Sequence, residues 1–231
     1  MDMITPTEIK PNTSLAGNQP GVDTRRNIWL ACGTLSSLLY MAMNIFIPMF
    51  YEGYDSVSQT VSELSAIGTP TRILWVALGT VYTLLVVAFG WGVRRAAGQN
   101  RPLRIVGILM LAYGVVSLLW PFAPMHRREA LAAGQEGFTD TMHLTLASVT
   151  VLLMTLAMGF GAAAFGIRFR IYSIITILIL LVFGILTALD APKVQANLPT
   201  PFAGIWERIN IGGFLLWIIV LARILMQKRK A

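Results

Sequence analysis

Long apolar stretches alternate with short polar breaks along most of the chain. Each stretch holds about 20 residues, the length that an α-helix needs to cross the hydrocarbon core of a bilayer. The breaks are rich in Gly, Pro, Arg and Asn, as in residues 94–102. The pattern therefore predicts an all-α fold, a polytopic membrane bundle of six transmembrane helices. The six stretches are approximately 28–50, 73–93, 105–122, 142–167, 171–189 and 205–226.

The polar segments before and after the first stretch predict two further features. Residues 1–26 contain no sustained apolar run, so we expect a flexible cytoplasmic tail and then one transmembrane domain over residues 27–231. After the first span, Ser56 and Gln59 fit a capping box, and apolar residues follow at helical spacing as far as Gly68. These signals predict a short interfacial helix over residues 56–66, lying on the membrane surface.

Composition and charge agree with a membrane protein. Of the 231 residues, 55% are hydrophobic and 13% are charged, too few polar side chains to cover a soluble domain. A net charge of +7 could indicate nucleic acid as a partner. Lys and Arg at the ends of membrane helices chiefly set the orientation of those helices in the membrane, however, so we do not expect nucleic acid as a partner. The single Cys32 excludes an intrachain disulfide.

The distribution of charge predicts the orientation in the membrane. Of the 18 Lys and Arg residues, 13 lie in the tail, in the second and fourth connections and at the C-terminal end. Eight of the 11 Asp and Glu residues lie on the opposite side. Because cytoplasmic segments retain Lys and Arg, we expect a multi-pass protein of the inner (cytoplasmic) membrane with both termini in the cytoplasm.

The apolar stretches also exclude several function classes. Away from their ends they contain no Asp, Glu, Lys, Arg or His. Proton relays, ion pumps and voltage sensors need ionisable groups at depth, and a transmembrane haem needs histidines within helices. No Gly-x-Ser-x-Gly motif and no Gly-rich phosphate loop with Lys occurs. A common serine hydrolase and a nucleotide-driven machine are therefore not indicated, and no cofactor is expected.

Candidate chemistry is confined to the outer connections and the adjoining helix ends. Asp140 and His143 stand three residues apart where the fourth span begins, so on a helix they share a face. A carboxylate beside an imidazole can supply metal ligands, or a general base held in one tautomer by its partner. We take both as candidate catalytic residues, with helix capping as the plainer alternative.

Candidate ligand-binding residues come from other outer segments. His126, Asp190 and Glu207 could converge with the Asp140 face to form a site. Arg208 could bind a lipid phosphate or, with Glu207, simply anchor the last span. The polar face of the predicted loop helix points either to water or to the mouth of the bundle. The candidates are Glu63, Ser62, His126, Asp190, Glu207 and Arg208.

Several of these residues belong to a familiar pattern. Residues 54–64 (YDSVSQTVSEL), residues 68–72 (GTPTR), His143 and the pair Glu207-Arg208 resemble the six-span prokaryotic family catalogued as domain of unknown function 998. The resemblance covers about residues 28–225. A more distant similarity, in the loop after the first span and in the layout, is to the Frag1/DRAM/Sfk1 proteins, some of which are associated with lipid remodelling. The resemblance implies a six-helix bundle and a lipid-related role, and it assigns no reaction.

Three functional hypotheses follow. The first is an integral membrane protein that binds a membrane lipid or hydrophobic small molecule at its extracytoplasmic mouth, with processing of that molecule left open. The alternative is a non-enzymatic membrane scaffold or interaction protein, in which the same residues cap helices. The second alternative is a metal-dependent membrane hydrolase with a water activated at His143 and Asp140. The first and third hypotheses require Asp140, His143 and Glu207 to lie within reach of one another. Oligomeric state is left open.

Overall fold

The computed structural model describes residues 20–227, and six of its helices are long and apolar enough to cross a membrane. This confirms the six predicted spans. The first helix begins at Pro20, inside the segment predicted as a tail, and the rest of that segment lies outside the described residues. The six helices are α1 (Pro20–Phe46), α2 (Arg72–Ala96), α3 (Arg101–Ser117), α5 (Phe138–Ala164), α6 (Ile167–Gln195) and α7 (Ala203–Gln227).

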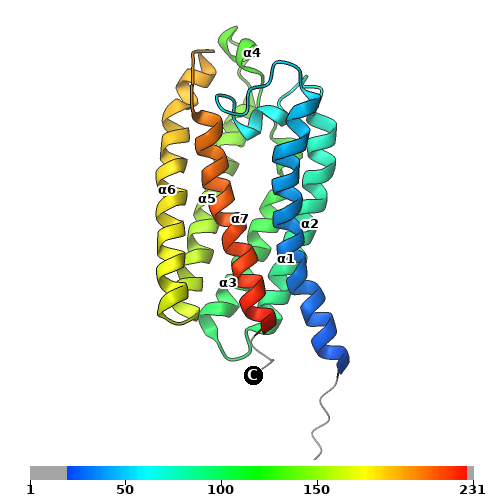
Figure 1. Cartoon of the computed structure of the whole chain (residues 1–231). Helices are drawn as coiled ribbons and strands as arrows, with labels where there is room; N and C mark the ends of the chain where they lie inside the picture. The colour runs from blue at the N-terminus through cyan, green and yellow to red at the C-terminus, as the bar shows by residue number, and fades with distance from the viewer. Residues whose placement is uncertain (1–19, 228–231) are drawn as a thin grey trace, which may run out of the picture.

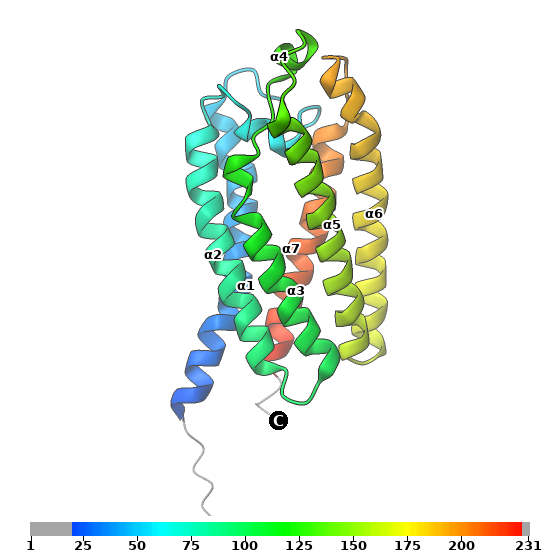
Figure 2. The same cartoon turned by 180° about the vertical axis from the view of Figure 1, so that it is seen from behind.

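The helices form a closed ring. Each packs against its neighbours in the order α1, α2, α3, α5, α6 and α7, and α7 packs against α1. The start of α1 and the end of α7 lie at one end of the bundle, which we call the termini end (Figure 1). The opposite mouth end carries the α1–α2 loop, the short helix α4 (Arg128–Ala132) and the α6–α7 turn (Figures 1 and 2).

The half of the bundle toward the termini end is tightly packed. Trp217 of α7 is fully buried there among apolar side chains of the other helices. Glycine lets the backbones approach closely, because a Cβ at Gly107 of α3 would lie 2.6 Å from the backbone nitrogen of Arg94 in α2. Gly161 of α5 likewise leaves room for the Trp217 ring. Such close packing is typical of membrane helices.

The outer surface of the bundle is apolar, as expected of a surface that faces lipid. Ile73 is 85% exposed and Phe138 is 80% exposed. At the termini end, the guanidinium groups of Arg94 and Arg95 lie 5.5 and 5.1 Å from the Trp91 ring centroid. This belt of Arg and Trp is typical of a membrane interface.

The loop after the first span differs from its prediction. Residues 55–58 form a turn in which the Asp55 carboxylate accepts hydrogen bonds from the backbone nitrogens of Val57 and Ser58, at 3.1 and 3.2 Å. A helix therefore forms only over Val61–Ser65, as a 3-10 helix, and its capping box is Thr60 with Glu63 instead of Ser56 with Gln59. The 3-10 helix is packed into the mouth, and its position on a membrane surface stays a prediction.

Candidate functional site

A cavity of about 990 Å³ occupies the mouth half of the bundle. All six long helices contribute to its wall, and the α1–α2 loop covers it at the mouth end through Thr60 and the 3-10 helix. Apolar side chains such as Val151, Met154 and Phe214 form the deep part. Ligand pockets in proteins measure about 300–1,000 Å³, so this volume is large enough for an amphiphilic molecule.

One wall of the cavity reaches the lateral surface of the bundle. Leu118 and Phe122, where α3 ends, line the cavity and are 42% and 70% exposed. Leu144 faces them from the first turns of α5 and is 47% exposed. Figure 2 shows the chain after α3 diverging from α5 at this level. Side chains that would face lipid therefore continue into the cavity.

Hydroxyl groups inside the cavity present acceptor atoms. Each of five Ser and Thr hydroxyls donates its proton to a backbone carbonyl of its own helix, as Ser148 does to Leu144 at 3.0 Å. Because that single proton is committed, the hydroxyl oxygen offers only lone pairs to a molecule in the cavity. The five residues are Thr80, Ser117, Ser148, Thr150 and Thr187.

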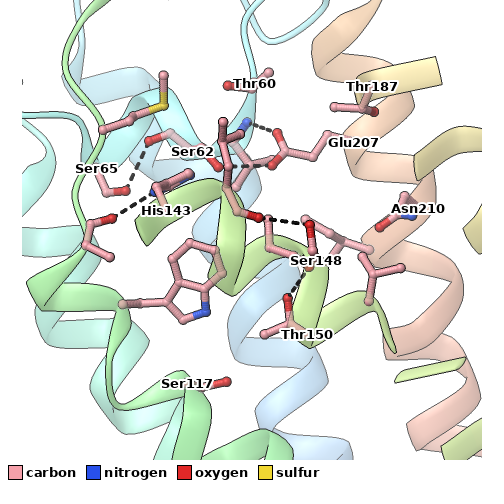
Figure 3. Close-up of a pocket in the computed structure, with 18 of the residues that line it drawn as sticks. Thr60, Ser62, Ser65, Ser117, His143, Ser148, Thr150, Thr187, Glu207 and Asn210 are labelled. Carbon is pink, nitrogen blue, oxygen red and sulfur yellow. Dashed lines mark hydrogen bonds between the residues drawn. The ribbon is translucent and has the colours of Figure 1, made fainter. Parts of the chain in front are cut away.

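Glu207 joins the first turns of α7 to the covering loop. Its carboxylate accepts a hydrogen bond from the backbone nitrogen of Val61 and another, at 3.2 Å, from the Ser62 hydroxyl (Figure 3). Both Ser62 and Glu207 line the cavity. The sequence prediction that these residues gather at the mouth therefore agrees with their position, while their role in binding stays a prediction.

Glu63 is paired with Arg128, a residue that was not among the predicted site residues. Its carboxylate receives the Arg128 guanidinium at 2.6 and 2.8 Å and the backbone nitrogen of Thr60 at 2.7 Å. Arg128 also donates to Thr200 at 2.8 Å. Partial burial lowers the pKa of Arg128, but the hydrogen bonds and the charge of Glu63 outweigh it and raise that pKa. Glu63 is a structural clamp between the loop and α4, instead of a group open to ligand.

Arg208 and Tyr54 fasten the same loop to α7. The Arg208 guanidinium donates to the carbonyl oxygens of Ser56 and Gln59 at 2.9 and 3.2 Å, and to the Tyr54 hydroxyl at 2.7 Å. Burial raises the pKa of Tyr54 well above its usual range, so this phenol stays neutral. A Cβ at Gly204 would collide with these loop carbonyls. Nη1 and Nη2 of Arg208 thus both donate to protein oxygens, and binding of a phosphate by Arg208 stays a prediction.

Asp140 and His143 do not form the predicted pair. Asp140 is the third residue of α5, and its carboxylate turns back to cap the helix at the nitrogen of Gly137, 2.9 Å away. There it also meets His126, whose ring nitrogen Nδ1 lies at 2.7 Å. The Nδ1 atom of His143 instead lies 2.9 Å from the carbonyl oxygen of Ala123. A carbonyl that only accepts, and not a carboxylate, therefore orients His143.

Asp140, His143 and Glu207 nevertheless border one cavity, and so does Ser62. That they lie within reach of one another stays a prediction. Figure 3 shows His143 and Glu207 among the side chains of the cavity wall. Asp190 does not line the cavity and forms an ion pair with Lys193 at 2.8 Å. Within residues 20–227, no three His, Cys, Asp or Glu side chains are grouped so that they could hold a metal ion. The metal-dependent hydrolase thus has no ligand set in this part of the chain.

Arg128, Tyr54 and the cavity-lining Tyr40 were not among the predicted site residues. One signal could have indicated Arg128, because it is an arginine on the side where acidic residues prevail. Such a residue is expected to have a carboxylate partner. Tyr40 lies within an apolar stretch, where an aromatic residue is expected to pack in the core. Only its position in the cavity lining distinguishes it from a core residue.

Comparison with known proteins identifies the family. Residues 34–224 match the family model described as protein of unknown function (DUF998). Since the match spans most of the chain, the protein belongs to this family, as the resemblance of the loop and helix-end motifs indicated. No curated protein and no solved structure matches the chain.

Proposed function

We propose that this integral membrane protein of the DUF998 family binds a lipid or another amphiphilic small molecule in the cavity of the mouth half. The observation that supports the proposal is the cavity itself, with a volume of about 990 Å³ and both polar and apolar walls. Polar groups at the mouth, such as Glu207 and Ser62, would hold the headgroup. The apolar interior between α5, α6 and α7 would hold the tail.

The contrast with the rest of the bundle supports binding over a purely structural role. A scaffold needs only packed helices, and a void in a packed interior costs stability because its lining atoms lose contacts. The termini half shows that this chain can pack its helices closely, as at Gly107 and Gly161. We therefore infer that the mouth half holds space for an occupant. The predicted orientation places this end outside the cytoplasm.

A pair of glycine substitutions tests the proposal. Gly79 of α2 lines the cavity, and Gly159 of α5 lies on the outer surface and does not. A Cβ at either glycine meets no atom within 4 Å. Gly79→Phe should fill part of the cavity without disrupting the fold, and Gly159→Phe should leave the cavity unchanged.

The measurement is mass spectrometry of molecules that co-purify with each variant from membranes into mild detergent. We expect the wild type and Gly159→Phe to retain the same amphiphile, and Gly79→Phe to lose it. Equal retention by Gly79→Phe, or no retained molecule in the wild type, would favour the scaffold hypothesis. The catalytic roles of His143 and Asp140 stay predictions that a bound molecule would let us test.

A further inference from the structure

Glu207 differs from the other buried or half-buried carboxylates of the mouth end in having no basic side chain paired with it. Glu63 is paired with Arg128 and Asp190 with Lys193, and the Asp140 carboxylate lies 2.7 Å from Nδ1 of His126. Glu207 forms no ion pair with any residue of the described part of the chain. Its neighbour Arg208 donates to neutral oxygens of the covering loop instead. A half-buried carboxylate that accepts only two hydrogen bonds from neutral donors keeps unused acceptor capacity.

The second group at the cavity wall that needs a donor is His143. Its Nδ1 atom faces the carbonyl oxygen of Ala123 at 2.9 Å, and a carbonyl can only accept, so Nδ1 carries the proton. In the neutral ring Nε2 is then an acceptor. No residue of the described chain donates to it. The ring packs against Trp120 in a T-shaped arrangement, with 4.9 Å between the ring centroids.

Two hydroxyls of the lining also act as acceptors, because the protons of Ser148 and Thr150 are committed to backbone carbonyls. The arginine of the described cavity lining, Arg72, already donates to the carbonyl oxygens of Ser65 and Pro121 at 2.8 and 3.3 Å. A headgroup with several N–H donors and a positive charge would satisfy Glu207 and His143 together.

Aromatic rings of α1 and α2 also line the cavity and favour a cation there. Tyr40 and Tyr82 stand with 4.8 Å between their ring centroids, and Trp75 contacts Tyr40 edge-on at 5.7 Å. All three line the cavity. The faces of such rings attract an ammonium group, more strongly where water is excluded.

From these observations, and resting on the proposed function, we infer that the cavity ligand is an amphiphile with a protonated primary amine. Its ammonium group donates to the Glu207 carboxylate and to Nε2 of His143, and its alkyl chain lies in the apolar part of the cavity. Such an amine occurs in a free long-chain amine and in an ethanolamine headgroup, and the chemistry recognised is the same in both.

The test uses the full-length protein in maltoside micelles and four probes with the same chain. Dodecylamine carries an ammonium with three donors, dodecyltrimethylammonium a cation with none, dodecanol no charge, and dodecyl phosphate a negative charge. Binding is measured by native mass spectrometry and by the shift of the thermal unfolding midpoint. We expect dodecylamine to bind about tenfold more tightly than each of the other three, because only it forms charge-assisted hydrogen bonds with Glu207.

The outcomes separate this inference from the proposed function. If none of the four probes binds, the proposed function fails. If dodecanol, dodecyl phosphate or dodecyltrimethylammonium binds as tightly as dodecylamine, the proposed function stands and the inference is overturned. A parallel comparison of lysophosphatidylethanolamine and lysophosphatidylcholine distinguishes the sources. A preference for the ethanolamine lipid over dodecylamine assigns an aminophospholipid, and the reverse order assigns a free amine.

A matched pair of variants locates the recognition. Glu207→Gln keeps an oxygen for the Val61 nitrogen and removes the charge. It should abolish the preference for dodecylamine over dodecanol while leaving the binding of dodecanol unchanged. Glu129→Gln removes the same charge from an exposed residue of α4 and should bind as the wild type does. An unchanged preference in Glu207→Gln would overturn the inference, and if that variant does not fold, the order of the four probes on the wild type decides alone.

Discussion

Particular glycines and tryptophans on the long helices have opposite surroundings in the two halves of the bundle. In the termini half, Gly107 lets α3 approach the backbone of α2, and Trp217 fills the space beside Gly161. In the mouth half, a Cβ at Gly79 would meet nothing, and Trp75 borders an open cavity. The same residue types therefore close one half and leave space in the other. The difference teaches that the void is a local feature of this fold and not a consequence of loose packing throughout the bundle.

The largest expected difference between the halves concerns the two tryptophans. Trp217→Ala should lower the free energy of unfolding by about 3–5 kcal/mol, because a fully buried ring leaves a cavity that its neighbours cannot fill. Trp75→Ala should cost about 1 kcal/mol or less, since its ring already borders open space. Unfolding in mixed micelles, followed by far-ultraviolet circular dichroism, measures both. Equal losses would contradict the division of the bundle into a packed and an open half.

A smaller effect is expected where the mouth is clamped. Arg128→Met should lower the free energy of unfolding by about 2–3 kcal/mol, because it leaves the carboxylate of Glu63 buried without its cation. Adding Glu63→Gln should recover a large part of that loss. The double-mutant cycle isolates the pair. A loss in Arg128→Met that Glu63→Gln does not relieve would show that Arg128 acts mainly through Thr200 and the loop carbonyls.

The smallest effect concerns the glycines. Gly107→Ala should cost about 1–3 kcal/mol, because its Cβ would press on the backbone of Arg94 at 2.6 Å. Gly79→Ala should be neutral or stabilising by about 0.5 kcal/mol, since the Cβ is accommodated and the helix gains propensity. The same unfolding assay checks both variants. Stabilisation by Gly107→Ala would show that α2 and α3 separate easily, and would remove the basis for calling this half closed.

The spans were predictable because their signal is local. An apolar stretch of sufficient length, bounded by polar residues, leaves one structural solution in a membrane, and six such stretches became six helices. The loop after the first span was harder. Both Ser56 with Gln59 and Thr60 with Glu63 fit the spacing of a capping box. The turn built by Asp55, together with the Arg128 partner of Glu63, selects the second.

The sequence indicated the position of some candidate residues at the mouth but none of their contacts. The depth of Asp140, His143 and Glu207 follows from their place at helix ends, and all three do border the cavity. Their partners come from segments whose approach no spacing reveals, as with the carbonyl of Ala123 for His143. The cavity could not be predicted either, because its existence depends on how helices far apart in the sequence pack against one another.

The lateral wall of the cavity has a consequence for how a ligand would arrive. The covering loop is held by Glu207, Arg208 and the Glu63–Arg128 pair, so passage from water through the mouth would have to break these bonds. Beside Leu118, Phe122 and Leu144 the cavity meets the surface that faces lipid. An amphiphile already dissolved in the bilayer would load sideways through this wall. The bound fraction of the protein would then depend on the mole fraction of the ligand in the membrane. Adding more buffer at a constant ratio of ligand to lipid would leave that bound fraction nearly unchanged.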